Sequence, residues 1–455
     1  MSDTLMISVS GMRGHVGTDL TPELVARHAA ALGAWVRSSG ARSTVILGRD
    51  ARTSGPMFAR AAAAGLMSVG VDVVDLGVVP TPTVQMAVEH HHAGAGLILT
   101  ASHNPIEWNA LKFVGPDGIF LDAEAGERVR ALAEKGPPRA GWDGLGAVTD
   151  DPGAVSRHLD AVLALPAIDL AAIRRRGFHV ALDCVRGAGA VAMLPLLERL
   201  GCRVSGINLE ADGRFPRPPE PVPENLGELG RTVRESRADL GLAVDPDVDR
   251  LAVVDELGRA IGEDYTLAFA VRAVLDGRGS EAKNPKVVVN LSTSLVVDDA
   301  ARAVGATVIR AAVGEANVAR AIRDQGAVIG GEGNGGVMYP ALHIGRDAPL
   351  GVALILHLLA TSGVTVAQLV DAAPRYTIVK AKAPRGPELG PLYDRLRRRF
   401  ADATVDDRDG LRLAWADRWL HVRPSGTEPI VRLIAEAPTP AEADALVAAG
   451  RELLQ

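Results

Sequence analysis

The sequence contains little cysteine, few aromatic residues and no excess of basic charge. Its 455 residues include two cysteines, Cys184 and Cys202, which form no CxxC pair. Free thiols in a reducing compartment are therefore expected. Aromatic residues make up 4% of the chain and the formal net charge is −6. Because nucleic-acid binding usually needs a basic face and stacking aromatics, we expect no nucleic-acid partner.

A signal-like start and a long apolar run are also missing. The N-terminal stretch MSDTLMISVSG has neither a basic beginning nor an apolar core, which argues against secretion. The longest helix-like apolar stretch, residues 350–364, is interrupted by His357. It is shorter than the roughly 20 residues that a membrane span needs, so it is predicted to be a buried helix. We expect a cytoplasmic protein with no membrane partner.

The chain does contain a recurring pattern of apolar strand, turn and helix. Residues 43–55, 178–190 and 286–297 each combine an apolar strand with a polar or glycine-rich turn and helix-like sequence. Strands that are apolar throughout and alternate with helices are typical of α/β sheets covered on both faces. The pattern predicts an α/β fold with three similar mixed-sheet α/β domains, and the strand-rich tail predicts a smaller C-terminal α+β domain.

Changes in composition predict where these domains meet. Residues 136–153 are rich in Gly, Pro and Asp, residues 255–265 form a turn before a helix, and strand-like alternation begins after residue 372. Proline-rich residues 214–226 are predicted to form a surface loop. The predicted domains are residues 1–150, 151–254, 255–372 and 373–455.

The segment TASHNP, residues 100–105, is not explained by packing. Pro105 disfavours helix at Asn104, so Ser102 is expected on a loop at the carboxyl end of a strand, where α/β sheets place their sites. No GxSxG pattern surrounds the serine, so a hydrolase nucleophile is not indicated. Lys112 could bring a cation towards this loop. An ordinary polar loop is the alternative interpretation.

The segment DPDVDR carries Asp245, Asp247 and Asp249 between two strand-like runs. Three carboxylates at this spacing repel one another unless a cation screens them, and hard oxygen ligands suit Mg²⁺. Together with Glu256 they also match EF-hand positions, but Arg250 stands where the turn of that loop needs glycine and the flanks are strand-like. The motif therefore predicts a strand–loop–strand magnesium site, with a plain acidic turn as the alternative.

Two further segments indicate a sugar phosphate as the ligand. In GGEGNGG, residues 330–336, glycines allow close backbone approach, while Glu332 and Asn334 can hydrogen-bond to hydroxyls. The segment RPSGTEPIVR combines guanidinium groups, hydroxyls and a flexible turn, a set suited to a phosphate monoester. Its candidate ligands are Arg423, Ser425, Gly426, Thr427 and Arg432. The segments GRDART, residues 48–53, and VGEANV, residues 313–318, could line a site or be simple turns.

In this order, and together with SGMRG at residues 10–14, the four segments resemble the α-D-phosphohexomutase family over essentially the whole chain. The resemblance implies four domains around a central cleft. It implies interconversion of hexose 6-phosphate and hexose 1-phosphate through a phosphoserine enzyme and a 1,6-bisphosphate. The implied cofactors are Mg²⁺ and a hexose 1,6-bisphosphate activator, the implied ligands are sugar phosphates, and the protein is expected to be a monomer or homodimer.

The resemblance also implies a role for individual residues. Ser102 resembles the phosphoserine, whose phosphate joins Asp245, Asp247 and Asp249 around Mg²⁺. The residues that would line the transfer site are Arg13, His103 and Lys112. The residues that would bind substrate are Arg250, Glu332, Asn334, Arg423, Ser425, Gly426, Thr427 and Arg432.

The sequence departs from the family pattern at the end of the sugar loop, where Gly336 stands in place of a histidine that several members carry. His343 is a possible substitute, and His103 and Lys112 are the first candidates for acid and base. The forms SGMRG, IEWNALK and GEGNGG most resemble the phosphoglucosamine mutase-type branch. The alternatives are a phosphomannomutase/phosphoglucomutase of dual specificity and a phosphoserine-dependent sugar phosphatase.

Overall fold

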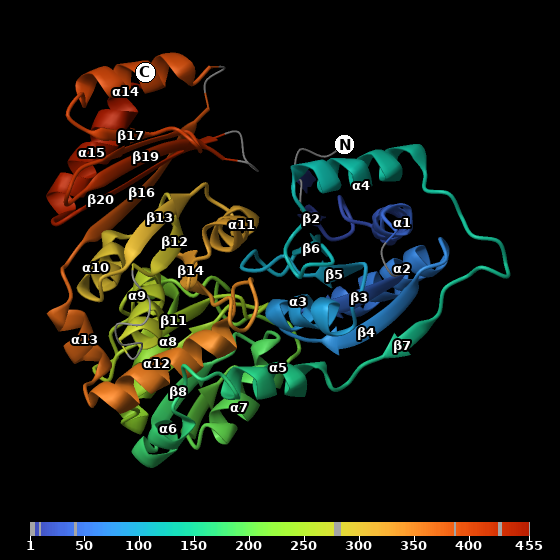
Figure 1. Ribbon diagram of the computed structural model, residues 1–455, viewed down its shortest axis with the longest axis horizontal. Helices are drawn as coiled ribbons and strands as arrows, with labels where there is room; N and C mark the ends of the chain where they lie inside the picture. Colours follow the sequence, from blue (N-terminus) through green and yellow to red (C-terminus); the bar gives the residue numbers. More distant parts are fainter. Residues whose placement is uncertain are drawn as a thin grey trace.

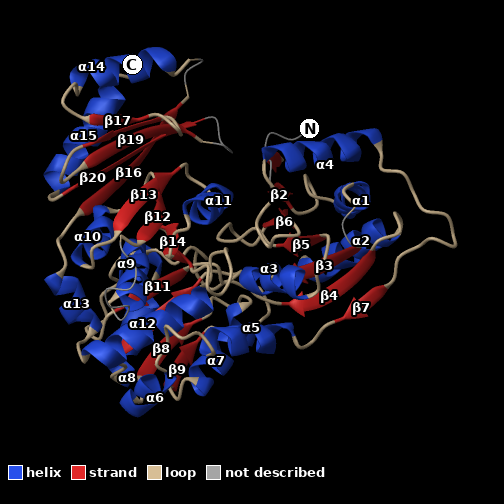
Figure 2. Cartoon of the chain, viewed as in Figure 1, coloured by secondary structure: helices blue, strands red, loops and turns tan. Residues whose placement is uncertain are grey.

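The structure is a computed structural model that describes residues 5–8, 11–40, 43–276, 284–385, 388–425 and 430–454. The strands of the described residues form four sheets. Figure 1 shows these sheets along an arc that follows the chain, with the N-terminal sheet at one end and the C-terminal sheet at the other. Helices flank the sheets along the arc (Figure 2).

The first sheet has seven strands in the order β1-β2-β6-β5-β3-β4-β7. Helices α1, α2 and α4 pack on one face, and α3 packs on the other. The strands are β1 (Met6–Ser8), β2 (Gly11–His15), β3 (Thr44–Arg49), β4 (Asp72–Val78), β5 (Ala95–Leu99), β6 (Trp108–Val114) and β7 (Val148–Asp150). The helices are α1 (Pro22–Ser38), α2 (Gly55–Met67), α3 (Thr81–His90) and α4 (Ala123–Lys135). Strand β7 lies within the segment predicted to be a connector and adds an edge strand to this sheet.

The second sheet has the order β11-β10-β8-β9 and the third has the order β13-β12-β14-β15. Their strands are β8 (His179–Asp183), β9 (Arg203–Ile207), β10 (Leu240–Val244), β11 (Leu251–Val254), β12 (Lys286–Asn290), β13 (Thr307–Ala311), β14 (Ile329–Glu332) and β15 (Gly336–Met338). Their helices are α5 (Ala154–Leu163), α6 (Leu170–Arg176), α7 (Gly189–Arg199), η1 (Pro223–Asn225), α8 (Gly227–Ser236), α9 (Glu263–Leu275), α10 (Leu295–Ala303), α11 (Glu315–Gln325), α12 (Ala348–Ser362) and α13 (Val366–Ala372).

These two sheets share one hydrophobic core, in which α9 and α12 are central. The first turn of α12 is capped by the Asp347 side chain, which accepts a hydrogen bond from the Leu350 amide, and the helix ends where Gly363 adopts a φ of +70°. Nearly all of α12 is buried, as the apolar run predicted. Within the described ranges no single helix is long and apolar enough to span a membrane, although α12 and α13, bent by 83°, together satisfy length and composition.

The fourth sheet is antiparallel, in the order β16-β20-β19-β18-β17, and has a hydrophobic core of its own. The strands are β16 (Thr377–Pro384), β17 (Thr404–Asp406), β18 (Leu411–Ala414), β19 (Trp419–Pro424) and β20 (Ile430–Ala437). Two helices, α14 (Gly390–Arg399) and α15 (Pro440–Glu452), accompany it. Strands that alternate buried and half-exposed side chains, as β20 does, suit a sheet with only one face covered.

The first three sheets share one topology. In each, a first strand pairs in parallel with the second and the third, and the third pairs with an antiparallel fourth. The hairpins that join third and fourth strands are β5–β6, β10–β11 and β14–β15. They carry TASHNP, DPDVDR and the GEGNGG loop, respectively. The three motifs therefore occupy equivalent positions at the carboxyl ends of three parallel strands, where α/β sheets place their sites.

Candidate active site

Ser102 lies at the turn between β5 and β6 with its backbone in the left-handed region, at φ +49°. This conformation is uncommon for a residue other than glycine and persists only where neighbouring contacts impose it. The residue is 3% exposed. Its Oγ donates to Asp245 Oδ2 at 2.8 Å, which joins the first sheet to the second.

The conformation of this loop is imposed by Arg52, on the turn after β3. Its buried guanidinium donates to four backbone carbonyls of the β5–β6 connection, those of Ser102, Asn104, Pro105 and Trp108, at 2.6–2.9 Å. Asp50 fixes Arg52 from the other side and also accepts from Thr100. The sequence left GRDART open as a lining loop or a simple turn. In the structure it supports the serine loop, a role indicated beforehand only by its place after an apolar strand.

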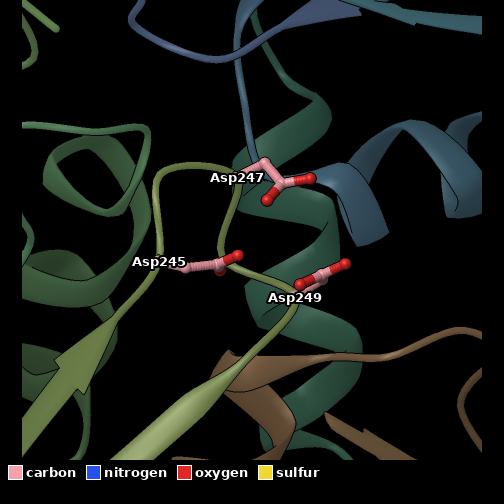
Figure 3. A group of neighbouring side chains, drawn as sticks. All are labelled: Asp245, Asp247 and Asp249. Carbon is pink, nitrogen blue, oxygen red and sulfur yellow. The ribbon is translucent and has the colours of Figure 1, made fainter. Parts of the chain in front are cut away.

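The three aspartates converge on one side of the β10–β11 hairpin (Figure 3), where one carboxylate oxygen from each lies within 4.8 Å of the other two. The turn is formed with Val248 at φ +63°, a strained conformation for a β-branched residue. One oxygen of each carboxylate is already bound: Asp245 Oδ2 by Ser102, Asp247 Oδ2 by Lys112 and Thr81, and Asp249 Oδ2 by Arg346. The Oδ1 atoms of Asp247 and Asp249 are buried without a hydrogen-bond partner among the described residues.

The electrostatics of this triad favour a cation. Burial, followed by the charges of Asp249 and Asp247, raises the pKa of Asp245 well above its usual range. Burial opposes ionisation of Asp247 as well, but the Lys112 ammonium together with hydrogen bonds from Asp245 and Thr81 outweighs it and lowers that pKa. Buried oxygens without partners and carboxylates that repel one another fit a hard divalent ion such as Mg²⁺.

Lys112, on β6, crosses from the first sheet to the metal loop, where its Nζ lies 2.7 Å from Asp247 Oδ2 and 4.0 Å from Asp249 Oδ2. Burial acts to lower its pKa, but the two carboxylates outweigh it and raise the pKa. Thr81, at the start of α3, donates its hydroxyl to Asp247 Oδ2 and its amide to the Asp247 carbonyl. Thr81 was not among the residues predicted from sequence, because no motif marks it.

Arg13, His103 and Arg250 surround the serine. Arg13, on β2, donates to Asn104 Oδ1 at 2.7 Å. His103 Nδ1 lies 3.4 Å from Ser102 Oγ, and the pKa of His103 is held well below its usual range by the nearby Arg250 charge and by burial. Arg250 contacts Glu220, in the proline-rich loop, at 3.2 Å. A neutral imidazole and two guanidinium groups therefore lie next to the serine loop.

The sugar loop places Glu332 at the end of β14 and Asn334 in the turn. Glu332 is 3% exposed, and its Oε1 accepts from Asn290 and from the Gly314 amide. Asn334 Oδ1 accepts from the Gly336 amide at 3.3 Å. Glu332 Oε2 accepts from Arg346, a buried residue that the sequence prediction did not include.

His343 is bound away from the sugar loop. Its Nε2 lies 2.9 Å from Asp347 Oδ2 at the start of α12, where His158 Nε2 approaches the same oxygen at 2.8 Å. The two imidazoles and the carboxylate form a buried cluster that joins α5 to α12. The structure therefore places His343 in a structural cluster.

The predicted phosphate-binding residues lie on the fourth sheet. Arg423 on β19 and Arg432 on β20 face each other across the ladder. Two cations in that register repel, so an anion between them is favourable. Arg423 Nε also donates to Asp409, which in turn accepts from the Val313 amide, in the loop between β13 and α11. The Ser425 amide donates to the Ile430 carbonyl, while Gly426 and Thr427 lie outside the described residues.

Contacts between the first and second sheets thus bring one group of predicted site residues together. They are Ser102, His103, Lys112, Arg13, Arg250 and the three aspartates. Glu332 joins them through Arg346, which contacts both Glu332 and Asp249. The arginines of the fourth sheet are placed on a separate sheet that docks against the third (Figure 1). One cluster suits phosphoryl transfer and the other suits holding a second phosphate.

Four domain families match the chain in order. They are described as phosphoglucomutase/phosphomannomutase, alpha/beta/alpha domains I, II and III, at residues 5–139, 156–258 and 262–376, and the C-terminal domain at residues 380–453. A "probable phosphoglucosamine mutase" of Methanopyrus kandleri is 39% identical over 94% of this chain and 93% of that protein. A "phosphoglucomutase/phosphomannomutase" of Thermococcus kodakarensis is 36% identical over 98% of this chain and 97% of that protein. The crystal structure of a phosphoglucomutase/phosphomannomutase family protein from Burkholderia thailandensis superposes with a TM-score of 0.85 at 26% identity, covering 99% and 98% of the two chains.

Proposed function

The chain belongs to the phosphoglucomutase/phosphomannomutase family, the α-D-phosphohexomutases, and we propose that it interconverts glucosamine 6-phosphate and glucosamine 1-phosphate. The four matching domain families confirm the family predicted from the motifs and the multidomain α/β fold class predicted from the recurring strand–turn–helix pattern. The protein is a mutase. The amino sugar is favoured by the motif forms and by the name of the Methanopyrus relative. The alternative is a dual phosphomannomutase/phosphoglucomutase, which the name of the Thermococcus relative favours.

The observation that carries the mechanism is the 2.8 Å hydrogen bond from Ser102 Oγ to Asp245 Oδ2, inside the cluster of three carboxylates. A serine phosphate at this position would enter the same cluster, in which two carboxylate oxygens have no hydrogen-bond partner among the described residues. Asp245, Asp247 and Asp249 would hold Mg²⁺ there, and the ion would neutralise charge on the phosphoryl group.

In the proposed reaction the free hydroxyl of the hexose monophosphate attacks phosphorus, and the bond from phosphorus to Ser102 Oγ breaks. The product is a hexose 1,6-bisphosphate, which reorients and returns its other phosphate to Ser102. Lys112 keeps its charge because its pKa is raised, so it acts by electrostatic stabilisation. His103, whose pKa is lowered, is neutral and can accept the hydroxyl proton. Its Nδ1 lies 3.4 Å from Ser102 Oγ, so the same imidazole can return a proton to Oγ as the bond to phosphorus breaks. Arg13 and Arg250 would bind the transferring group.

The remaining proposed contacts position the sugar and its second phosphate. Glu332 and Asn334 would accept hydrogen bonds from sugar hydroxyls. The second phosphate would lie between Arg423 and Arg432, whose like charges face each other on adjacent strands. The residues of the same loop assigned to this phosphate are Ser425, Gly426 and Thr427.

We further propose a cytoplasmic enzyme, a monomer or homodimer, with domains at residues 1–150, 151–254, 255–372 and 373–455. Each limit falls between the last element of one sheet segment and the first element of the next: between β7 and α5, between β11 and α9, and between α13 and β16.

The test is a substrate panel with Mg²⁺ and a catalytic amount of hexose 1,6-bisphosphate, followed by phosphorus NMR. Glucosamine, mannose and glucose 6-phosphates are compared for formation of the 1-phosphate. Preference for glucosamine is expected. Equal rates with mannose and glucose would assign dual specificity, and inorganic phosphate without isomer would identify a phosphatase.

The serine is tested in the same assay with Ser102→Ala, and Ser236→Ala is the matched control. Ser236 is a serine of α8 whose hydroxyl donates to the Thr232 carbonyl, away from the candidate site. Ser102→Ala is expected to abolish isomerisation and Ser236→Ala to leave it unchanged. Normal turnover by the Ser102 variant would refute the phosphoserine mechanism.

A further inference from the structure

Arg346 is the one cation among the described residues whose guanidinium meets three buried carboxylates from three different segments of the chain. Its Nη2 lies 2.5 Å from Asp249 Oδ2, its Nη1 2.9 Å from Glu332 Oε2, and its Nε 3.1 Å from Glu315 Oε2. The side chain is 9% exposed, so solvent competes little for these contacts. Asp249 belongs to the metal loop, Glu332 to the sugar loop and Glu315 to the first turn of α11.

The planar guanidinium makes this arrangement possible. It presents N–H donors in fixed directions, whereas a lysine ammonium is a single point charge that cannot span three separated carboxylates. Two of the carboxylates are also tied to another element: Glu332 to Asn290, and Glu315 to Gln85 of α3 in the first sheet, at 3.2 Å. Through Arg346 the metal loop and the sugar loop are held at a set spacing.

Gly336 provides the space for this side chain. A Cβ atom at Gly336 would lie 2.2 Å from Arg346 Cδ and 2.8 Å from Arg346 Cγ, which is closer than van der Waals contact permits. The backbone of Gly336 is not in the left-handed region, so conformation alone does not require glycine there. Because the guanidinium is held by three carboxylates, the arginine cannot move aside without losing them. Gly336 and Arg346 are therefore sterically interdependent.

We propose that Arg346 is a positioning residue that couples occupation of the metal loop to occupation of the sugar loop, with Gly336 making room for it. The proposal rests on the proposed function, because it assigns Asp249 to Mg²⁺ and Glu332 to the sugar. A ligand that orders Asp249 also orders Glu332 through the shared guanidinium. Mg²⁺ and the sugar phosphate should then each strengthen binding of the other by the same factor.

The first experiment measures this factor by calorimetry. The full chain is titrated with Mg²⁺ in the absence and presence of saturating glucosamine 6-phosphate. In the wild-type protein the sugar phosphate is expected to tighten Mg²⁺ binding by about fivefold or more, the usual range of coupling between sites. In Arg346→Lys and Arg346→Ala the factor is expected to fall to within about twofold of one. An undiminished factor in a folded Arg346 variant would overturn the proposal.

The second experiment uses Gly336→Ala, which keeps every charge. The added methyl group should displace Arg346, so this variant should also lose the coupling, with a higher KM for sugar phosphate and a smaller change in kcat. In the Arg346→Ala background the clash with the arginine is gone and the methyl group is left 3.2 Å from Asn334 Oδ1. The double variant should therefore lose no further coupling beyond that lost in Arg346→Ala alone. Additive losses, or normal coupling in Gly336→Ala, would overturn the proposal.

The control is Gly227→Ala, at the start of α8, where an added Cβ would have no atom within 4 Å. It should leave coupling and kinetics unchanged. If Arg346→Ala does not fold, Gly336→Ala still decides the question in a chain that retains the arginine. If binding is coupled but the substrate panel yields no isomer, the proposed function has failed while the positioning role stands. If the substrate panel yields isomer but binding is not coupled, the positioning role has failed while the proposed function stands.

Discussion

Replacing Asp347 by asparagine is expected to destabilise the protein by about 3–5 kcal/mol, a cost set by the donors that this one carboxylate accepts. Asp347 is fully buried. Its Oδ1 accepts from the Leu350 amide at 2.9 Å, and its Oδ2 lies 2.8 Å from His158 Nε2 and 2.9 Å from His343 Nε2. Burial opposes the charge of Asp347, but the two imidazoles outweigh it and hold its pKa below the usual range.

The magnitude follows from what asparagine can and cannot replace. Its carbonyl oxygen can still cap α12 by accepting from Leu350, and asparagine caps helices as well as aspartate does. Its amide NH₂ would then face His158 and His343 where both now donate. Hydrogen bonds to a charged acceptor contribute roughly 1.5–3 kcal/mol each, so losing two gives about 3–6 kcal/mol. Measured costs of removing one partner of a buried charge pair, about 3–5 kcal/mol, narrow that range.

The assay is urea unfolding monitored by circular dichroism, with Asp122→Asn as the matched control. Asp122 caps α4 through the Ala125 amide at 2.8 Å and contacts no imidazole of the described residues; its exposed ion pair with Arg320, at 3.8 Å, contributes little. The same substitution there should change the free energy of unfolding by less than about 0.5 kcal/mol. If the free energy of unfolding fell no further in Asp347→Asn than in Asp122→Asn, the reasoning about the two histidines would be refuted.

Three further outcomes are expected. Burial lowers the pKa of His421 to about 4, so as pH falls the unfolded chain binds a proton at this histidine before the folded chain does. The contribution of His421 to stability is therefore present above about pH 6.5 and is lost as pH falls towards 4. Between pH 7.5 and pH 4.5 the free energy of unfolding of the wild-type protein should fall by roughly 2–3 kcal/mol more than that of His421→Gln. Equal decreases in urea unfolding would contradict the lowered pKa of His421. Glu436, on β20 of the fourth sheet, accepts from the Leu295 amide of α10 and from Trp419, and Glu436→Gln weakens both contacts. Amide hydrogen exchange at the start of α10 should then accelerate about tenfold. Unchanged exchange would show that Glu436 does not hold the fourth sheet against α10. Asp247→Asn should weaken Mg²⁺ binding at least about tenfold by calorimetry, and a normal affinity would remove Asp247 from the metal site.

Short-range sequence patterns were sufficient to predict several strand–helix pairs and the clustering of the three aspartates. Apolar runs followed by turn residues predicted β3 with α2, β8 with α7 and β12 with α10, all of which form. The alternation of Asp245, Asp247 and Asp249 predicted a cluster of carboxylates, because a tight hairpin loop brings alternate residues together whatever the rest of the chain does. The order of four motifs predicted the family. The roles of individual site residues remain predictions.

Contacts between distant segments required the tertiary structure. Ser102 meets Asp245 across 143 residues, and Arg346 meets Asp249 across 97. Nothing local to Arg52 or Arg346 distinguishes either from the many surface arginines, because a guanidinium becomes part of a site only when the fold brings buried acceptors to it. The sequence determined which side chains carry chemistry on each hairpin. The packing of the sheets decided which cations and carboxylates face one another, because burial and partner choice depend on all the elements at once.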